Sequence, residues 1–120
     1  MGTDYIDVYY THWQCKTYGL VPIAETMGEL MRMKEEGKIR AIGASNVQLR
    51  HLEEYRQSGQ LDVIQEKYSM LDRRVEEELL PYCEANTVTL QTYSPIEQGL
   101  LTGTVPNGYV PRPGEPSTRN

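Results

Sequence analysis

Residues 37 to 46 read GKIRAIGASN, an apolar run that starts after one glycine and ends in small and polar side chains. Ile39 to Ala44 is long enough for a short strand and holds the β-branched residues that strands favour. Before it, IAETMGELMRMKEEGK has apolar residues at helical spacing from Ile23 and ends at Gly37. After it, NVQLRHLEEYRQSG repeats the helical pattern and ends at Gly59. The stretch therefore predicts a strand between two helices.

The same alternation continues on both sides of this stretch. Tyr5 to Thr11, Val63 to Lys67 and Val88 to Tyr93 are three further strand patterns. Arg73 to Asn86 predicts a helix with three glutamates in its early turns, where the helix dipole favours negative charge. Successive strand starts, near Ile6, Ile39, Val63 and Val88, lie 33, 24 and 25 residues apart, which is one βα unit per step. The repeat predicts an α/β fold with a parallel sheet and right-handed crossovers.

Composition narrows the class of protein. The chain has 120 residues, which fits one domain, and its 17 acidic against 12 basic residues give a net charge of −5. This charge opposes a general affinity for nucleic acid or an anionic membrane. Cys15 and Cys83 lie 68 residues apart without metal-ligand spacing, so neither a disulfide nor a metal site is predicted. The cysteine pattern leads us to expect a cytoplasmic protein, and no apolar window approaches the roughly 18 residues of a membrane span.

The C-terminal residues differ in composition from the rest. Four of the seven prolines follow Gly103, and no apolar periodicity accompanies them. We expect residues 1–103 to form the domain and residues 104–120 to be a loop or disordered tail.

Polar and aromatic side chains gather where the expected strands end. In parallel α/β sheets, ligands bind at the carboxyl ends of the strands, beside helix N-termini with unpaired N–H groups. The residues at these ends are Thr11, His12 and Trp13, then Ser45 and Asn46, then Gln65, and finally Tyr93, Ser94 and Pro95. Together they predict one shared site.

Each of these residues also has a structural explanation. Ser45 or Asn46 alone could be the N-cap of the following helix, since both types bond free N–H groups in a first turn. Gln65 could be a satisfied polar group in the core, Tyr93 a packing residue, and His12 a hydrogen-bonded structural histidine. The four strand ends taken together favour the functional explanation.

Four ordered motifs resemble the aldo-keto reductase family. DYIDVYYTHW looks like the fourth barrel strand of that family, GKIRAIGASN the fifth, VIQEKYSMLDR the sixth, and YSPIEQGLLTG the seventh with its following loop. The resemblance covers residues 3 to 103 and implies about half of a TIM-type (β/α)8 barrel, with parallel βα repeats and a Pro-rich C-terminal loop. Within the family, the similarity is to bacterial members that reduce small aldehydes such as methylglyoxal.

The resemblance also implies a chemistry. It implies reversible hydride transfer between NADPH or NADH and a small carbonyl substrate. His12 matches the histidine that donates a hydrogen bond to the substrate carbonyl. Tyr93 matches the aromatic residue that stacks on the nicotinamide. The residues that match the carboxamide-holding positions are Ser45, Asn46 and Gln65. Those that match the loop over the pyrophosphate are Ser94, Gln98, Gly99, Leu100 and Gly103.

The resemblance is partial, which affects the expected activity. The tetrad of the family also contains an aspartate, a proton-donating tyrosine and a lysine, all on strands before the fourth. We therefore expect these 120 residues to be catalytically incomplete, because general acid catalysis alone is worth about 10²- to 10⁴-fold. Our first hypothesis is a fragment or truncated product of an aldo-keto reductase.

Two alternatives belong to other classes of protein. The first is a non-catalytic scaffold or interaction protein that associates with itself through open strand edges. Such an open half-barrel would leave the interior side of Ile6, Val8, Ile42 and Ile64 partly exposed. The second alternative is an unrelated doubly wound binding domain, which the absence of a GxGxxG fingerprint disfavours.

Overall fold

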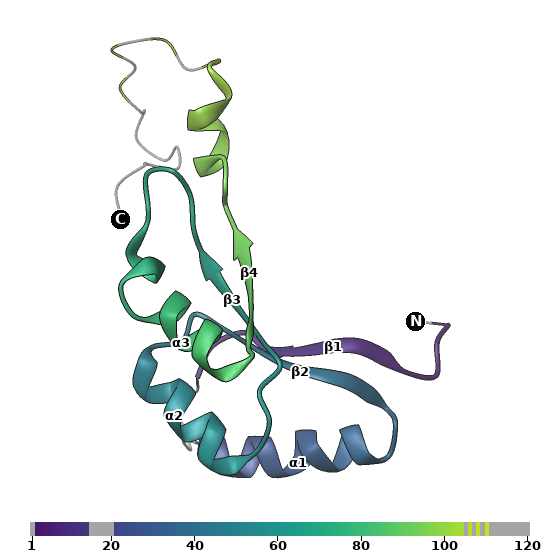
Figure 1. Cartoon of the computed structure of the whole chain (residues 1–120). Helices are drawn as coiled ribbons and strands as arrows, with labels where there is room; N and C mark the ends of the chain where they lie inside the picture. The colour runs from purple at the N-terminus through teal and green to yellow at the C-terminus, as the bar shows by residue number, and fades with distance from the viewer. Residues whose placement is uncertain (1, 15–20, 105, 107, 109, 111–120) are drawn as a thin grey trace.

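A computed structural model describes residues 2–14, 21–104, 106, 108 and 110 of the chain. Its four strands are all parallel and follow one another in the order β1-β2-β3-β4 (Figure 1). The strands are β1 (Ile6–Thr11), β2 (Ile39–Ser45), β3 (Val63–Lys67) and β4 (Thr89–Tyr93). The helices are α1 (Ile23–Glu35), α2 (Leu49–Ser58) and α3 (Leu79–Asn86), with 3-10 segments at Arg74–Glu76 and Glu97–Thr102. The predicted α/β class with a parallel sheet is confirmed.

Three of the four strand starts are the residues that the sequence predicts. The fourth strand starts one residue later than predicted, at Thr89. The reason lies at the end of α3, where Thr87 adopts a left-handed conformation with φ of 58° and the Val88 N–H bonds the Cys83 carbonyl. Val88 thus satisfies a carbonyl at the helix terminus instead of entering the sheet.

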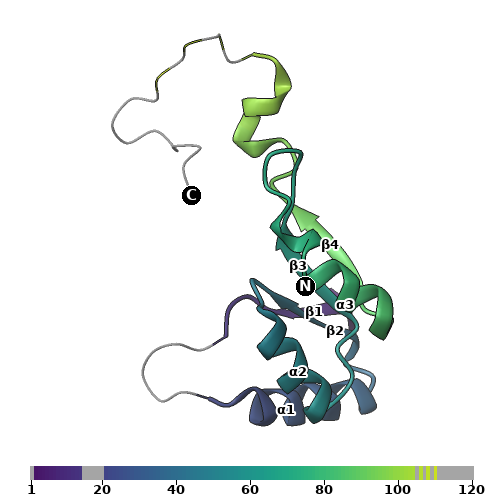
Figure 2. The same cartoon turned by 60° about the vertical axis from the view of Figure 1, so that its left-hand side comes forward.

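The helices lie along one face of the sheet (Figures 1 and 2). The core forms between that face and the helices, and its largest fully buried side chains are Tyr55, Met27, Ile39, Ile42, Leu52 and Ile64. Burial of such apolar side chains stabilises the layer by about 1.5–3 kcal/mol each. Sequence alternation places Tyr10 on the opposite, concave face, where its ring covers Gly43.

The expectation about Ile42 and Ile64 is wrong. Both side chains are fully buried against the helices, while Val8 is 37% exposed as expected and Ile6 is half-buried. The register explains the difference, because Ile42 pairs with Tyr9 and therefore points away from the face that carries Val8.

The predicted helix over Arg73–Asn86 is in fact two pieces. A 3-10 turn covers Arg74–Glu76, and α3 begins only at Leu79. Pro81 explains the break, because it lacks an N–H and is tolerated in the first turn of a helix but not in the interior. The three glutamates Glu76, Glu77 and Glu78 therefore precede α3 and do not occupy its early turns.

Most of the predicted tail, residues 105, 107, 109 and 111–120, lies outside the described residues. The domain boundary at Gly103 therefore stays a prediction. The preceding loop contains an unpredicted element, the 3-10 segment Glu97–Thr102, which is interrupted at Gln98 and Gly99.

We expect Gly43→Ala to destabilise the fold, because an added Cβ would overlap the Tyr10 ring. Overpacking of this kind costs about 1–3 kcal/mol, and urea denaturation of the variant would measure the loss. Gly28→Ala is the matched control, since nothing lies within 4 Å of its added Cβ and the position is helical. The control should raise the free energy of unfolding by about 0.5–1 kcal/mol. Equal effects of both substitutions would contradict the packing of Tyr10 on Gly43.

Candidate functional site

The carboxyl ends of the four strands meet at one edge of the sheet. Their register pairs Thr11 with Ala44, Ser45 with Gln65, and Lys67 with Tyr93. Because every neighbouring pair of strands is parallel, the polar residues that follow the strands lie at the same end of the sheet.

Asn46 joins three of these strand ends. Its Nδ2 donates to the His12 carbonyl and to Ser45 Oγ, both at 3.1 Å. Its Oδ1 accepts the Tyr93 hydroxyl at 2.8 Å. The backbone of Asn46 has a φ of 58°, a left-handed value that asparagine tolerates better than most residues. A single amide therefore links β1, β2 and β4 just beyond their ends.

Ser45 and Gln65 continue the network toward the concave face. Ser45 is only 2% exposed, and its hydroxyl donates to the Gln65 carbonyl at 2.8 Å. Gln65 Nε2 donates to Gln91 Oε1 at 3.2 Å, and the Tyr10 hydroxyl donates to the same oxygen. The sequence reasoning missed Gln91, although its position two residues before Tyr93 places both side chains on one face of β4.

The structure places His12 at this edge through its backbone. The His12 carbonyl accepts from Asn46, while its ring lies edge-on to Trp13 with ring centroids 6.1 Å apart. Both side chains line a hollow of about 580 Å³ between β1 and α1. The ring is therefore exposed beside the Asn46 network and is not one of the network's hydrogen-bonding groups.

The N-cap explanation for Ser45 and Asn46 is wrong. The N-cap of α2 is Gln48, and its backbone N–H donates to Nδ1 of His51 at 3.1 Å. His51 thus stabilises the first turn of α2 from within the helix. Ser45 and Asn46 precede the cap and use their side chains between strands.

Glu66 supports the loop that carries Asn46. It is 8% exposed, and its Oε1 accepts the Val47 N–H at 2.6 Å. Burial raises the pKa of Glu66, and the Val47 N–H partly offsets this by stabilising the carboxylate. Burial, followed by the charge of Glu66, also raises the pKa of the Cys83 thiol. Nothing in the sequence pattern distinguishes Glu66 from an exposed strand residue.

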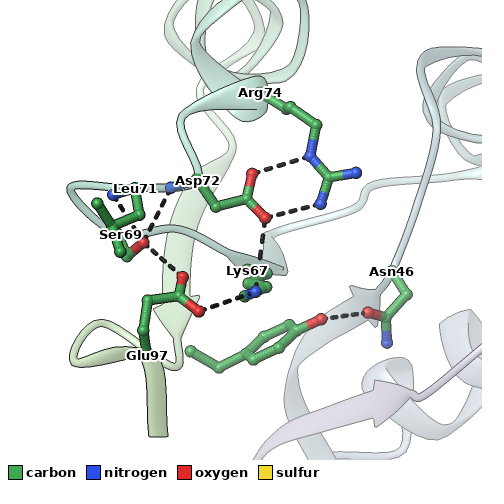
Figure 3. A network of polar contacts seen from close by, with 8 residues as sticks. Asn46, Lys67, Ser69, Leu71, Asp72, Arg74 and Glu97 are labelled. Carbon is green, nitrogen blue, oxygen red and sulfur yellow. Dashed lines mark hydrogen bonds and ion pairs between the residues drawn. The ribbon is translucent and has the colours of Figure 1, made fainter. Parts of the chain in front are cut away.

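A second polar cluster joins the loops that follow β3 and β4 (Figure 3). We call it the Glu97 cluster, and its members are Lys67, Ser69, Asp72, Arg74 and Glu97. Glu97 Oε1 accepts the Ser69 hydroxyl at 2.5 Å, and Oε2 pairs with Lys67 Nζ at 3.0 Å. These two contacts lower the pKa of Glu97, the Ser69 hydrogen bond most. The Glu97 carboxylate raises the pKa of Lys67.

Arg74 completes the Glu97 cluster. Its Nε donates to Asp72 Oδ1 at 2.8 Å and its Nη2 donates to Asp72 Oδ2 at 2.7 Å. This bidentate contact lowers the pKa of the Asp72 carboxyl. A hollow of about 300 Å³ opens beside the cluster, and Leu100 lines it together with Lys67 and Arg73. The sequence reasoning did not identify this cluster.

The residues expected to cover a pyrophosphate lie in the segment after β4. Four of them have left-handed backbones, with φ of 54° at Ser94, 53° at Gln98, 97° at Gly99 and 76° at Gly103. Leu100 contacts the hollow beside the Glu97 cluster. The segment is thus adjacent to Tyr93 and to the Glu97 cluster, whereas the roles of its residues stay predictions.

The donor set suits an organic ligand with amide and hydroxyl groups. Hydroxyl, amide and phenol groups converge at the strand ends and offer neutral donors and acceptors. Within the described part of the chain, no three histidine, cysteine or acidic side chains are grouped to hold a metal ion. Among the described helices, none is both long and apolar enough to cross a membrane.

Parallel βα units in sequential strand order, with polar side chains gathered at the strand carboxyl ends, are the arrangement found in part of a (β/α)8 barrel. The sequence pattern of the Aldo/keto reductase family matches residues 1–120. The chain belongs to the Aldo/keto reductase family.

Named relatives agree with this family. The NADH-specific methylglyoxal reductase of Escherichia coli (strain K12) is 59% identical over 111 residues, which are 92% of this chain and 34% of the relative. The glycerol dehydrogenase of Gluconobacter oxydans superposes with a TM-score of 0.82 at 30% identity, over 91% of this chain and 32% of that one. An aldo/keto reductase from Klebsiella pneumoniae, solved with NADP and acetate, has a TM-score of 0.73 at 28% identity. The match covers 86% of this chain and 36% of that one. The chain spans about a third of each.

Proposed function

We propose that this chain forms the nicotinamide-holding wall of an NAD(P)H-dependent reductase of small carbonyl compounds. The observation that carries the proposal is the Asn46 network, in which one amide bonds Ser45 and Tyr93 directly and Ser45 in turn bonds the backbone carbonyl of Gln65. A carboxamide is recognised by paired donors and acceptors of this kind, and holding it orients one face of the nicotinamide ring. The bound cofactor would supply the hydride.

The proposal assigns cofactor binding and substrate binding to separate residues of the chain. Ser45, Asn46 and Gln65 would hold the carboxamide, and Tyr93 would pack its ring against the nicotinamide. His12, whose ring is exposed beside the network, would donate a hydrogen bond to the substrate carbonyl. Such a bond stabilises the negative charge that develops on the oxygen during hydride transfer.

The choice of cofactor and substrate follows the named relatives. We propose NADH in preference to NADPH, and a small aldehyde such as methylglyoxal as the substrate. The name of the Escherichia coli relative supports both choices. Cytoplasmic location remains a prediction, based on two cysteines without disulfide or metal-ligand spacing.

Titration of the chain with NADH, followed by cofactor fluorescence, tests the proposal. We expect Asn46→Ala to weaken binding about 10- to 100-fold, because the variant loses its bonds to the His12 carbonyl, Ser45 and Tyr93. NADPH should bind more weakly than NADH to the unchanged chain.

Asn86→Ala is the matched control for this substitution. Asn86 lies at the end of α3, where its amide contacts Arg56 and the Tyr82 carbonyl. Its loss should leave NADH affinity within about twofold, since surface substitutions rarely act at a distance. Equal affinity of the Asn46→Ala variant and the unchanged chain would contradict the proposed wall.

The open concave face supports a second candidate function, that of a self-associating scaffold. A hollow of about 470 Å³ on that face is lined mainly by the residues Val8, Tyr10, Ala41, Val63, Leu90 and Gln91. Apolar side chains beside unpaired strand edges favour association with another chain. The two functions differ in cofactor binding, which the scaffold does not require.

A further inference from the structure

Residues 94–103, which we call the β4 segment, have an unusual backbone. Ser94, Glu97 and Gln98 are not glycines, yet their φ values are 54°, 47° and 53°. Residues other than glycine rarely adopt this left-handed region of φ, and they keep it where contacts with the surrounding structure enforce it. Three such residues within five positions indicate that the β4 segment is held in its shape from outside.

Glu97 supplies the contact that holds the segment. Although it is an acidic residue in a surface loop, it is only 8% exposed. Its two carboxylate oxygens have separate partners, the Ser69 hydroxyl at 2.5 Å and Lys67 Nζ at 3.0 Å. Both partners come from β3 and the loop after it, so the carboxylate ties the β4 segment to the neighbouring strand (Figure 3).

The anchor itself is fixed by further bonds. Ser69 Oγ accepts the backbone N–H groups of Leu71 and Asp72 at 3.1 and 3.0 Å. Lys67 also lies 3.7 Å from Asp72, which is held by Arg74. An ion pair in such surroundings is sensitive to the loss of one partner, because the remaining charge is left poorly solvated and unpaired.

We propose that Lys67 and Glu97 are positioning residues, which hold the β4 segment in the shape that receives the phosphate groups of the dinucleotide cofactor. The inference rests on the proposed function, because it takes NADH as the ligand. Two observations carry it. The carboxylate fixes a segment whose backbone is otherwise unfavourable, and the ammonium group neutralises a carboxylate beside the hollow that Leu100 lines. Without Lys67, an unpaired negative charge would face an anionic ligand.

A double-mutant cycle on NADH affinity tests the inference. Lys67→Met and Glu97→Gln should each weaken binding about 10-fold, which corresponds to the loss of one charged hydrogen bond. The double variant should also be about 10-fold weaker, not 100-fold, because each single change already breaks the same pair. Lys67→Arg, which keeps the charge, should restore most of the affinity. Additive effects of the two substitutions would overturn the inference.

Arg73→Met is the control for general electrostatic attraction. Arg73 lines the same hollow, but its pair at 2.8 Å is with Glu76 and not with the β4 segment. Its loss should change NADH affinity less than about twofold. If Arg73→Met weakens binding as much as Lys67→Met does, charge attraction accounts for the effect and the inference fails.

Amide hydrogen exchange separates this inference from the proposed function, since it needs no cofactor. The Gly99 and Leu101 N–H groups both bond the Ile96 carbonyl, at 3.0 and 3.2 Å, and report on the β4 segment. Exchange at both should be about 10-fold faster in Lys67→Met and Glu97→Gln and unchanged in Arg73→Met. Unchanged exchange in the first two variants overturns the positioning role. Faster exchange without NADH binding by the unchanged chain would refute the proposed function and the cofactor-receiving role, but not the anchor.

Discussion

The 120-residue chain on its own is expected to oxidise neither NADH nor NADPH at a measurable rate with methylglyoxal or an aromatic aldehyde. Under the proposed function, the Asn46 network would form one wall of a site, and His12 would give the substrate at most one hydrogen bond. A positioned proton donor is worth about 10²- to 10⁴-fold, and the open concave face leaves the developing charge in contact with water. Cofactor absorbance followed over hours would measure the rate.

The two histidines of the chain provide matched variants for this assay. His12 is exposed at the strand edge, whereas His51 is part of the first turn of α2. Turnover that His12→Ala abolishes and His51→Ala leaves intact would contradict the expectation, because these residues would then complete a site. Turnover that survives both substitutions would indicate a contaminating full-length reductase.

The isolated chain should associate into dimers or larger species. The outer edges of β1 and β4 have no strand partner among the described residues, and Val8 and Tyr9 of β1 are 37% and 41% exposed. Unpaired edges and exposed apolar side chains favour pairing with a second chain. Light scattering should give a mass above the 13.8 kDa of one chain.

Two lysine substitutions locate the contact. Val8→Lys should reduce association, because it places a charge on the concave face beside an open edge. Met70→Lys is the control, since Met70 is 82% exposed in the loop after β3 and lies outside the sheet. A stable monomer of the unchanged chain would refute the prediction. Dissociation by Met70→Lys alone would place the contact in the loop.

Much of the fold could be predicted from local patterns. Three strand starts follow directly from β-branched runs spaced by one βα unit, and the parallel order follows from that spacing. The broken third helix could have been predicted as well, because Pro81 cannot occupy the interior of a helix that starts at Arg73. The sheet face on which Ile42 and Ile64 lie depends on the strand register, and the sequence of a single strand does not reveal that register.

The candidate site was predictable where it depends on strand ends. Ser45, Asn46, Gln65 and Tyr93 meet because parallel strands bring their carboxyl ends together. The ring of His12 could not be placed in the same way, since it lies beyond the end of β1 and beyond the strand alternation.

The Glu97 cluster illustrates the limit of sequence patterns. Lys67 and Glu97 lie 30 positions apart in the chain, and the pair forms because β3 ends beside β4, whose following segment carries Glu97. A charged residue in a loop looks solvent-exposed in sequence, and only its three-dimensional neighbours reveal its burial.

The strand order of the sheet has a consequence for how the chain acquires its structure. The order of the strands in the sheet equals their order in the chain. Each strand therefore pairs with the strand synthesised just before it, after one helical connection. Each strand pairs with a neighbour that is close in the sequence, so the entropic cost of loop closure is low at every step. During synthesis on the ribosome, the sheet can therefore grow one βα unit at a time, in the order in which β1 to β4 emerge.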